Sequence, residues 1–194
     1  LRFLQEGASV MVADLNESTG LETVSIAKAQ DLNDVDFVTA DVSKENDVEN
    51  MIKHTIERFD RIDCIFNNAG VGGAIGPITD TTVEDWDETF AILTRSVFLG
   101  IKHGARALIE QGEGGVILST SSIAGLGGGA GPQAYSAAKA SVINLTQNAA
   151  VELAPYRIRV NAIAPGFVET RLTAAMDEVK ALRPLGKLPV AVID

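Results

Sequence analysis

Tyr135 and Lys139 are the side chains whose types and spacing point most directly to chemistry. They stand four residues apart near the start of an expected helix, and this spacing puts both on one helix face. A nearby ammonium favours the charged form of a phenol, and a tyrosine prepared in this way can give or take a proton at a carbonyl or alcohol oxygen. A tyrosine and a lysine at this spacing are more often an ordinary pair on a helix surface, so the surrounding motifs must show whether the pair has a catalytic role.

That context lies where apolar runs end. Ser122 closes one run, and its hydroxyl can both donate and accept hydrogen bonds. Asp41 closes another, and the small or polar residues 67–70 (NNAG) and 165–170 (PGFVET) follow two more. If these runs are parallel strands, the residues meet at the carboxyl edge of one sheet, where open α/β sheets bind ligands. The sequence therefore predicts a single site at this edge.

The order of the runs predicts the fold. Short, β-branched apolar runs alternate with segments whose apolar residues recur at helical spacing. This indicates an α/β fold, a parallel sheet with helices on both faces and right-handed crossovers. No linker or repeat breaks the series, so residues 1–194 are interpreted as one domain. The expected strands are 8–15, 35–42, 62–70, 114–122 and 158–166, and the expected helices are 17–30, 43–60, 82–112 and 134–155.

Polar residues and glycines mark the ends of these helices. Asn16 and Ser43 are candidate N-caps, because each stands just before a helical pattern. Gly7 and Gly112 are candidate C-terminal stops, and Gly7 would end the tail of a helix at the start of the chain.

Composition excludes several classes of partner and site. Acidic residues outnumber basic ones by 26 to 16, which argues against nucleic acid as the main partner. Cys64 is the only cysteine, so one chain can form neither a disulfide nor a cysteine-based zinc site. His54 and His103 are isolated and expected on exposed helix faces, so no metal site is predicted. No apolar run could span a membrane and no signal peptide is evident, which favours a cytoplasmic protein.

The glycine-rich run 126–139 invites a different interpretation. Within it, residues 129–134 fit G-x-G-x-x-A, a variant of the dinucleotide-binding fingerprint. The acidic residue that should follow about 20 residues later, after another strand, is missing, since Glu152 lies within the same expected helix. Pro132 also removes a backbone N–H. We expect this run to be a substrate-side loop whose glycines leave room beside Tyr135.

Asp14 is better placed for the acidic role, because it ends the first expected strand. Only thirteen residues precede it, so the strand and glycine loop that should come about 20 residues earlier would fall before Leu1. The other end, residues 184–194, stops without completing an element.

Taken together, these motifs resemble the short-chain dehydrogenase/reductase family. They occur in the family's order and roughly its spacing from the first residues to about Thr170, and jointly they are highly specific. The resemblance implies a Rossmann-like doubly wound parallel sheet. The residues that carry it are Asp14, Asp41-Val42, NNAG at 67–70, Ser122, YSAAK at 135–139, RVNAIAPG at 159–166 and Thr170.

The resemblance also implies a reaction. Tyr135 would be the general acid/base, Lys139 would assist it and hold the nicotinamide ribose, and Ser122 would orient the oxygen of a secondary alcohol or ketone. A hydride would pass between substrate and a nicotinamide cofactor. The helices 82–112 and 134–155 resemble those that pair subunits into tetramers or dimers. The implied cofactor-binding residues are Asp14, Asp41, Val42, Asn68, Ala69, Gly70, Tyr135, Lys139, Pro165, Gly166, Val168 and Thr170.

Asp14 predicts which cofactor is preferred. A carboxylate accepts hydrogen bonds from a ribose diol but repels a 2′-phosphate. The following residues, Leu15 and Asn16, supply no arginine to receive a phosphate. NAD is therefore expected over NADP, unless Asp14 is only a turn residue at the end of its strand.

Leu93 departs from the family pattern. Many relatives carry an asparagine at the matching place, where it helps to hold a water in a proton relay behind the lysine. A leucine side chain can form no hydrogen bond, and Thr94 points to another helix face. We expect activity to be retained through backbone and solvent, with weakened catalysis as the alternative.

Other interpretations stay open. Tyr135 could serve a dehydratase or epimerase, although such relatives usually carry a larger C-terminal substrate domain. A catalytically silent nucleotide-binding protein would fit Leu93. Residues 170–186 are expected to form part of a lid over the substrate, and loop 71–80 to shape the pocket. The aromatic residues Trp86, Phe90 and Phe98 are interpreted as core or interface positions.

Overall fold

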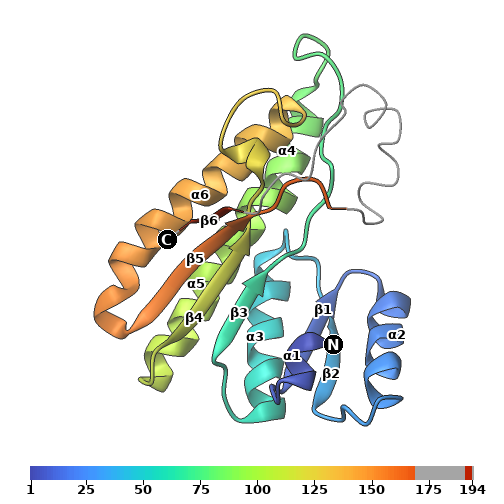
Figure 1. The fold of residues 1–194 in the computed structure, drawn as a ribbon, viewed down its shortest axis with the longest axis vertical. Helices are drawn as coiled ribbons and strands as arrows, with labels where there is room; N and C mark the ends of the chain where they lie inside the picture. The colour runs from blue at the N-terminus through green and yellow to red at the C-terminus, as the bar shows by residue number, and fades with distance from the viewer. Residues whose placement is uncertain (169–190, 194) are drawn as a thin grey trace. The chain divides into compact units, whose positions relative to one another are not determined.

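The computed structural model describes residues 1–168 and 191–193, so Thr170 and the expected lid lie outside the described residues. The chain forms two compact units, Leu1–Asp63 and Cys64–Asp194, each with its own sheet (Figure 1). The interpretation of residues 1–194 as one domain stays a prediction.

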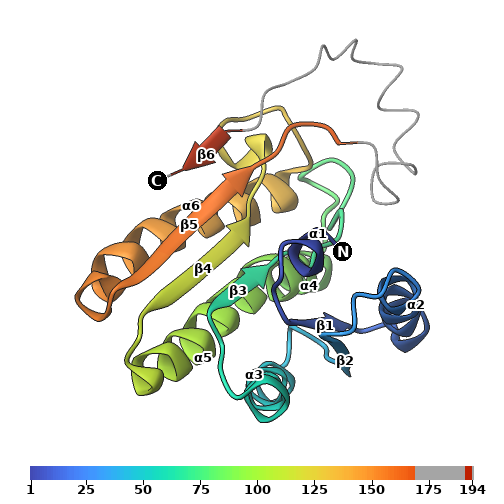
Figure 2. The same ribbon diagram turned by 60° about the horizontal axis from the view of Figure 1, so that its bottom comes forward.

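The first unit is a two-stranded parallel sheet with helices on both sides. Strand β1 pairs with β2 from Val10↔Val35 to Asp14↔Thr39. Figures 1 and 2 show α2 and α3 on opposite sides of this pair. A small core is formed by Leu4, Val24, Ala27 and Val35. The elements are α1 (Arg2–Gln5), β1 (Val10–Asp14), α2 (Glu17–Lys28), β2 (Val35–Thr39) and α3 (Glu45–Phe59).

One of the two expected N-caps is confirmed and the other is wrong. Asn16 Oδ1 accepts from the backbone N–H of Thr19 at 3.2 Å and caps α2. Ser43 does not cap α3, which begins at Glu45 without a side-chain cap. The Ser43 hydroxyl instead donates to Asp41 Oδ1 at 2.6 Å, since a carboxylate is a stronger acceptor than a neutral group.

The second unit is a four-stranded sheet in the order β3-β4-β5-β6. Strands β3, β4 and β5 are parallel as predicted, while the unexpected short β6 runs antiparallel to β5. Helices α5 and α6 contact each other and run along this sheet (Figure 2). The elements are β3 (Cys64–Asn67), α4 (Val83–Phe90), α5 (Ser96–Gln111), β4 (Gly115–Thr120), α6 (Gln133–Leu153), β5 (Ile158–Ala164) and β6 (Ala191–Ile193).

The long helix predicted over 82–112 is present but not uniform. Thr82 caps it by accepting from the N–H of Asp85, and Gly112 ends it in the left-handed conformation at φ 76°. Between α4 and α5 lies a single π turn, Ala91–Arg95. Such turns are rare, and they often mark functional sites.

Helix α5 is buried over a broader face than the sequence pattern indicates. His103 is only 5% exposed, so the expectation that it is exposed is wrong. The reason is that α5 packs against β3, β4 and α6 at once. Gly104 brings the helix especially close to the sheet, because a Cβ there would lie 2.7 Å from Ile65 Cδ1. His54, by contrast, is exposed as expected.

Candidate active site

The side chain and the backbone of Lys139 are both hydrogen-bonded to residues at the carboxyl end of β4. Its side chain lies on α6 one turn after Tyr135, and the residue is only 4% exposed. Lys139 Nζ donates to the backbone carbonyl of Thr120 at 2.6 Å. The backbone carbonyl of Lys139 accepts from the Ser121 hydroxyl at 2.8 Å. The lysine is thus fixed in position rather than extended into solvent.

The charge of Lys139 is affected by this position. Burial lowers the pKa of Lys139 from 10.5 to about 8, because the charged form loses hydration. Its Nζ lies 5.7 Å from the centre of the Tyr135 ring. The two side chains therefore share one helix face, and a lysine that is still mostly charged at neutral pH lies near the phenol.

Ser122 is positioned by the turn that follows β4. Its Oγ accepts from the N–H of Ala124 at 3.2 Å and caps the short helical turn Ile123–Gly125. Gly125 presses this turn against α6, since a Cβ there would lie 2.7 Å from the carbonyl carbon of Lys139. Because Oγ accepts this bond, the Ser122 hydroxyl proton can still be donated to another oxygen.

Asn68, Ala69 and Gly70 follow β3 and are exposed. Asn68 Oδ1 accepts from the Thr120 hydroxyl at 2.9 Å. A Cβ on Gly70 would lie 3.9 Å from Lys139 Nζ. The backbone at Gly70 therefore lies close to the Lys139 ammonium.

The loop after β5 is tied to the same region. The carbonyl of Pro165 accepts from the N–H of Ile123 at 3.1 Å, directly after Ser122. Gly166 follows, and Val168 is half exposed. The predicted residues Asn68, Ser122, Lys139 and Pro165 are thereby linked through the end of β4.

Leu93 lies within the π turn and is 1% exposed. Its Cδ2 would lie 3.3 Å from a Cβ on Gly70, so an apolar side chain stands near the lysine side of the site. The Thr94 hydroxyl donates to the carbonyl of Ala138 at 3.2 Å. Thr94 is thus engaged with the α6 backbone, which agrees with the expectation that it is a poor substitute for asparagine.

The glycine run is open at its start and lies close to Tyr135 at its end. A Cβ on Gly127, Gly128 or Gly129 would meet no atom within 4 Å. At Gly131 a Cβ would lie 3.3 Å from Tyr135 Cδ1. The low wall and the substrate role expected of this loop stay predictions.

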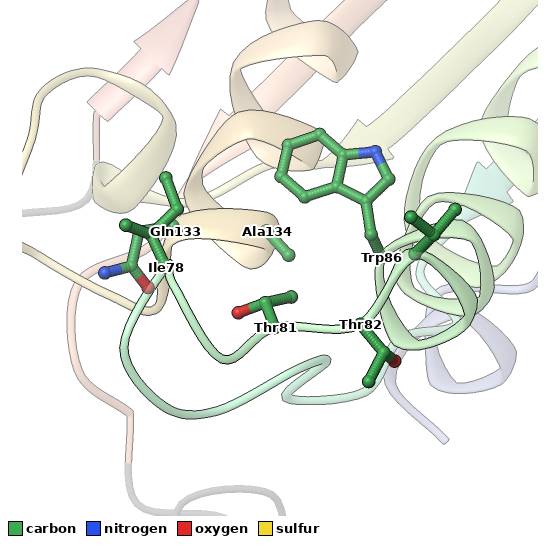
Figure 3. A pocket seen from close by; sticks show the side chains of 7 residues that line it. Ile78, Thr81, Thr82, Trp86, Gln133 and Ala134 are labelled. Carbon is green, nitrogen blue, oxygen red and sulfur yellow. The ribbon is translucent and has the colours of Figure 1, made fainter.

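A hollow of about 200 Å³ lies between the start of α6 and the residues that lead into α4. Figure 3 shows Trp86 and Ala134 on its two sides, with Ile78 and Gln133 at its edge. Trp86 stacks on Phe90 with ring centres 4.7 Å apart. Gln133 and Ala134 directly precede Tyr135 in the sequence. The hollow is lined by Ile78, Thr81, Thr82, Val83, Trp86, Gln133 and Ala134.

Three predicted cofactor residues belong to the first unit. Asp14 is exposed, and its Oδ1 accepts from the N–H of Asn16 at 2.8 Å. Asp41 accepts from both the N–H and the hydroxyl of Ser43. The hydroxyl bond is the main cause of a lowered pKa of Asp41; burial opposes it, and the Ser43 N–H and the nearby Lys44 lower the pKa further. Val42 lies beside it and is half-buried.

Comparison with known proteins identifies the family. A family model described as enoyl-(acyl carrier protein) reductase matches residues 1–187. Short-chain dehydrogenase reductase 4 of Arabidopsis thaliana is 38% identical over 187 residues, or 95% of this chain. The chain belongs to the short-chain dehydrogenase/reductase family.

Other members agree in sequence and in fold. Levodione reductase of Leifsonia aquatica is 39% identical over 95% of this chain and 68% of its own length. The crystal structure of NAD⁺-bound xylitol dehydrogenase matches with a TM-score of 0.86 and 30% identity, over 95% of this chain and 71% of that one. The chain spans 62% of the length of the Arabidopsis relative.

Residues 1–168 and 191–193 contain no group of three or more His, Cys, Asp or Glu side chains that could hold a metal ion. Within the same ranges, none of the helices has the length and apolar character needed to cross a bilayer.

Sequence reasoning missed Thr120 and Ser121. Both contact Lys139, and Thr120 also contacts Asn68. A signal was available, because residues 119–122 form an unbroken run of hydroxyl side chains at the end of a strand.

Proposed function

We propose that this protein is an oxidoreductase that transfers a hydride between NAD and a secondary alcohol or ketone. The observation that carries the proposal is the buried Lys139, whose Nζ lies 5.7 Å from the Tyr135 ring. Relatives named as reductases and dehydrogenases support the same reaction class.

A nicotinamide cofactor fits the residues at the end of β4. The closeness of the exposed loop residue Gly70 to Lys139 Nζ supports binding there. When bound, the cofactor would supply or accept the hydride at its nicotinamide ring. The residues proposed to hold it are Asp14, Asp41, Val42, Asn68, Ala69, Gly70, Tyr135, Lys139, Pro165, Gly166, Val168 and Thr170.

Residues of the chain itself transfer the proton of the substrate hydroxyl. In the oxidation direction, the Tyr135 phenolate takes the proton of the substrate O–H as the hydride leaves the adjoining carbon, and a carbonyl forms. The Lys139 ammonium stabilises that phenolate. Ser122 donates a hydrogen bond to the substrate oxygen, since its own Oγ already accepts from Ala124.

Asp14 supports NAD rather than NADP. Its carboxylate is exposed and has one oxygen bonded to the N–H of Asn16. The second oxygen can accept from a ribose hydroxyl, whereas a 2′-phosphate would be repelled.

The substrate is a small molecule, and the active form is a homo-oligomer, either a tetramer or a dimer. A groove of about 510 Å³ runs between α5 and α6, and Phe98 on it is 47% exposed. An apolar groove of this kind, with charged side chains along it, suits an interface between subunits.

Cofactor reduction with a panel of secondary alcohols tests this function. NADH formation is expected with at least one alcohol, with a lower rate when NADP replaces NAD. Tyr135→Phe should lower turnover at least 100-fold, on the order expected for loss of an acid/base group. Tyr156→Phe is the matched control, because this exposed tyrosine lies at the far end of α6.

Two results would contradict the proposal. A preference for NADP would overturn the role given to Asp14. Binding of NAD without turnover of any alcohol or ketone would favour a catalytically silent nucleotide-binding protein, a function that the buried Leu93 near Lys139 also fits.

A further inference from the structure

Thr120 forms two hydrogen bonds with two different groups of the candidate site. Its side-chain hydroxyl donates to Asn68 Oδ1 at 2.9 Å. Its backbone carbonyl accepts from Lys139 Nζ at 2.6 Å. One residue at the end of β4 thus contacts both the loop after β3 and the lysine of α6.

The backbone of Thr120 is itself well fixed. In the sheet it is paired with Ile163 of β5, and the preceding Ser119 is paired with Asn67 of β3. The N–H of the next residue, Ser121, donates to the carbonyl of Ile163 at 2.8 Å. A residue paired with β5 and directly preceded by one paired with β3 can impose a position on the side chains that bind to it.

The bond from Thr120 also defines the orientation of the Asn68 amide. A side-chain amide has one acceptor end and one donor end, which can exchange places by rotation. Since the hydroxyl of Thr120 occupies the oxygen end, the Nδ2 end is left to donate to a ligand oxygen.

We propose that Thr120 is a positioning residue for the cofactor. Its hydroxyl orients Asn68 so that the amide Nδ2 donates to a cofactor oxygen, and its carbonyl independently holds Lys139 Nζ. This inference rests on the proposed function, because it assumes that a nicotinamide cofactor binds at this edge.

The two contacts can be separated by mutation. Thr120→Val keeps the shape of the side chain and the backbone carbonyl but removes the hydroxyl. Titration calorimetry with NAD should show binding weakened about three- to tenfold, the range expected for one hydrogen bond. Thr120→Ser keeps a hydroxyl and should restore affinity close to that of the unmodified chain.

Ser119→Ala provides the matched control. Ser119 is the neighbouring hydroxyl residue of β4, and its Oγ accepts from Asn67 Nδ2 rather than from Asn68 or Lys139. This variant should leave the dissociation constant for NAD unchanged. A general disturbance of β4 would weaken binding in both variants.

A double-mutant cycle tests whether the Thr120 hydroxyl affects NAD binding through Asn68. Asn68→Ala removes the partner from an exposed loop, so it is a second test that does not alter the strand. In that background Thr120→Val should weaken NAD binding no further, because contacting residues are not additive.

The possible failures are distinguishable. If the unmodified chain binds NAD and Thr120→Val binds it equally well, or if the effects of the two substitutions add, the positioning role is wrong while the proposed function stands. If the unmodified chain binds neither NAD nor NADP, the proposed function fails and this inference fails with it.

Discussion

Lys139 is fixed in position by hydrogen bonds, and its pKa is lowered. Its ammonium donates to Thr120, its backbone accepts from Ser121, and burial lowers its pKa to about 8. A lysine with this pKa is charged at neutral pH and loses its charge in mildly alkaline solution. Its support of the Tyr135 phenolate should therefore depend on pH within an accessible range.

The first prediction at this scale concerns that pH range. The pKa of Lys139 is lowered, so the charge is present below about pH 8 and is lost as the pH rises through this value. The rate of alcohol oxidation should accordingly decline above about pH 8. Leu93→Asn places a polar side chain near the lysine, which should raise its pKa, move the decline to higher pH and increase turnover modestly.

Initial rates measured across pH check this expectation, with Leu93→Met as the apolar control. Leu93→Met should keep the pH profile of the unmodified chain. If Leu93→Asn has the same pH profile as the unmodified chain, or a lower turnover, then Leu93 does not weaken a proton relay behind Lys139.

The elements of the fold are largely evident from the sequence. Five expected strands and four expected helical segments are present, because alternating apolar runs and helical spacing report burial directly. The π turn at Ala91–Arg95, the burial of His103 and the position of Ser43 were not foreseen. Each depends on a neighbour that the local pattern does not contain, such as the carboxylate of Asp41.

The roles of the candidate site residues stay predictions. The residues themselves could be assigned by motif, and the sheet edge follows from the alternation of strands and helices. The contacts of Thr120 and Thr94 could not be derived, because they join β4 to the loop after β3 and the π turn to α6. Such contacts depend on how elements distant in sequence pack together.

The turn that carries Ser122 gives a prediction at the scale of elements. Gly125→Ala would place a Cβ 2.7 Å from the backbone of Lys139, so the turn and α6 must move apart. We expect a loss of stability of about 1–3 kcal/mol, as for overpacking in a core, with weaker catalysis. Gly127→Ala is the control, because its Cβ would meet no atom within 4 Å.

Thermal unfolding of the two variants provides the measurement. Gly125→Ala should lower Tm clearly, while Gly127→Ala should leave it nearly unchanged. Equal Tm values would show that the approach of the turn to α6 is not tight.

For the molecule as a whole, the groove between α5 and α6 is the surface that bears on assembly. It is lined by apolar residues of both helices together with charged side chains such as Lys102, Arg106 and Glu152. Phe98 is 47% exposed on this groove, and under the proposed assembly it would be covered by a second subunit.

Phe98→Asp should therefore shift the protein to smaller species. A buried charge without a partner disfavours an interface, so size-exclusion chromatography with light scattering should report a lower mass than for the unmodified chain. Val151→Asp is the control, since Val151 is 79% exposed on α6 and does not line the groove. An unchanged mass for Phe98→Asp would place the subunit contact elsewhere.

The π turn between α4 and α5 bears on where residues can be inserted into or deleted from this helix. Each residue added to or removed from a helix rotates everything beyond it by about 100°. The π turn Ala91–Arg95 closes its hydrogen bonds over one residue more than an α turn, so deleting one residue there would restore an α turn and keep Gly104 of α5 facing Ile65. A one-residue deletion within Ala91–Arg95 should therefore be tolerated, whereas one within α5 would rotate the residues beyond it away from the sheet.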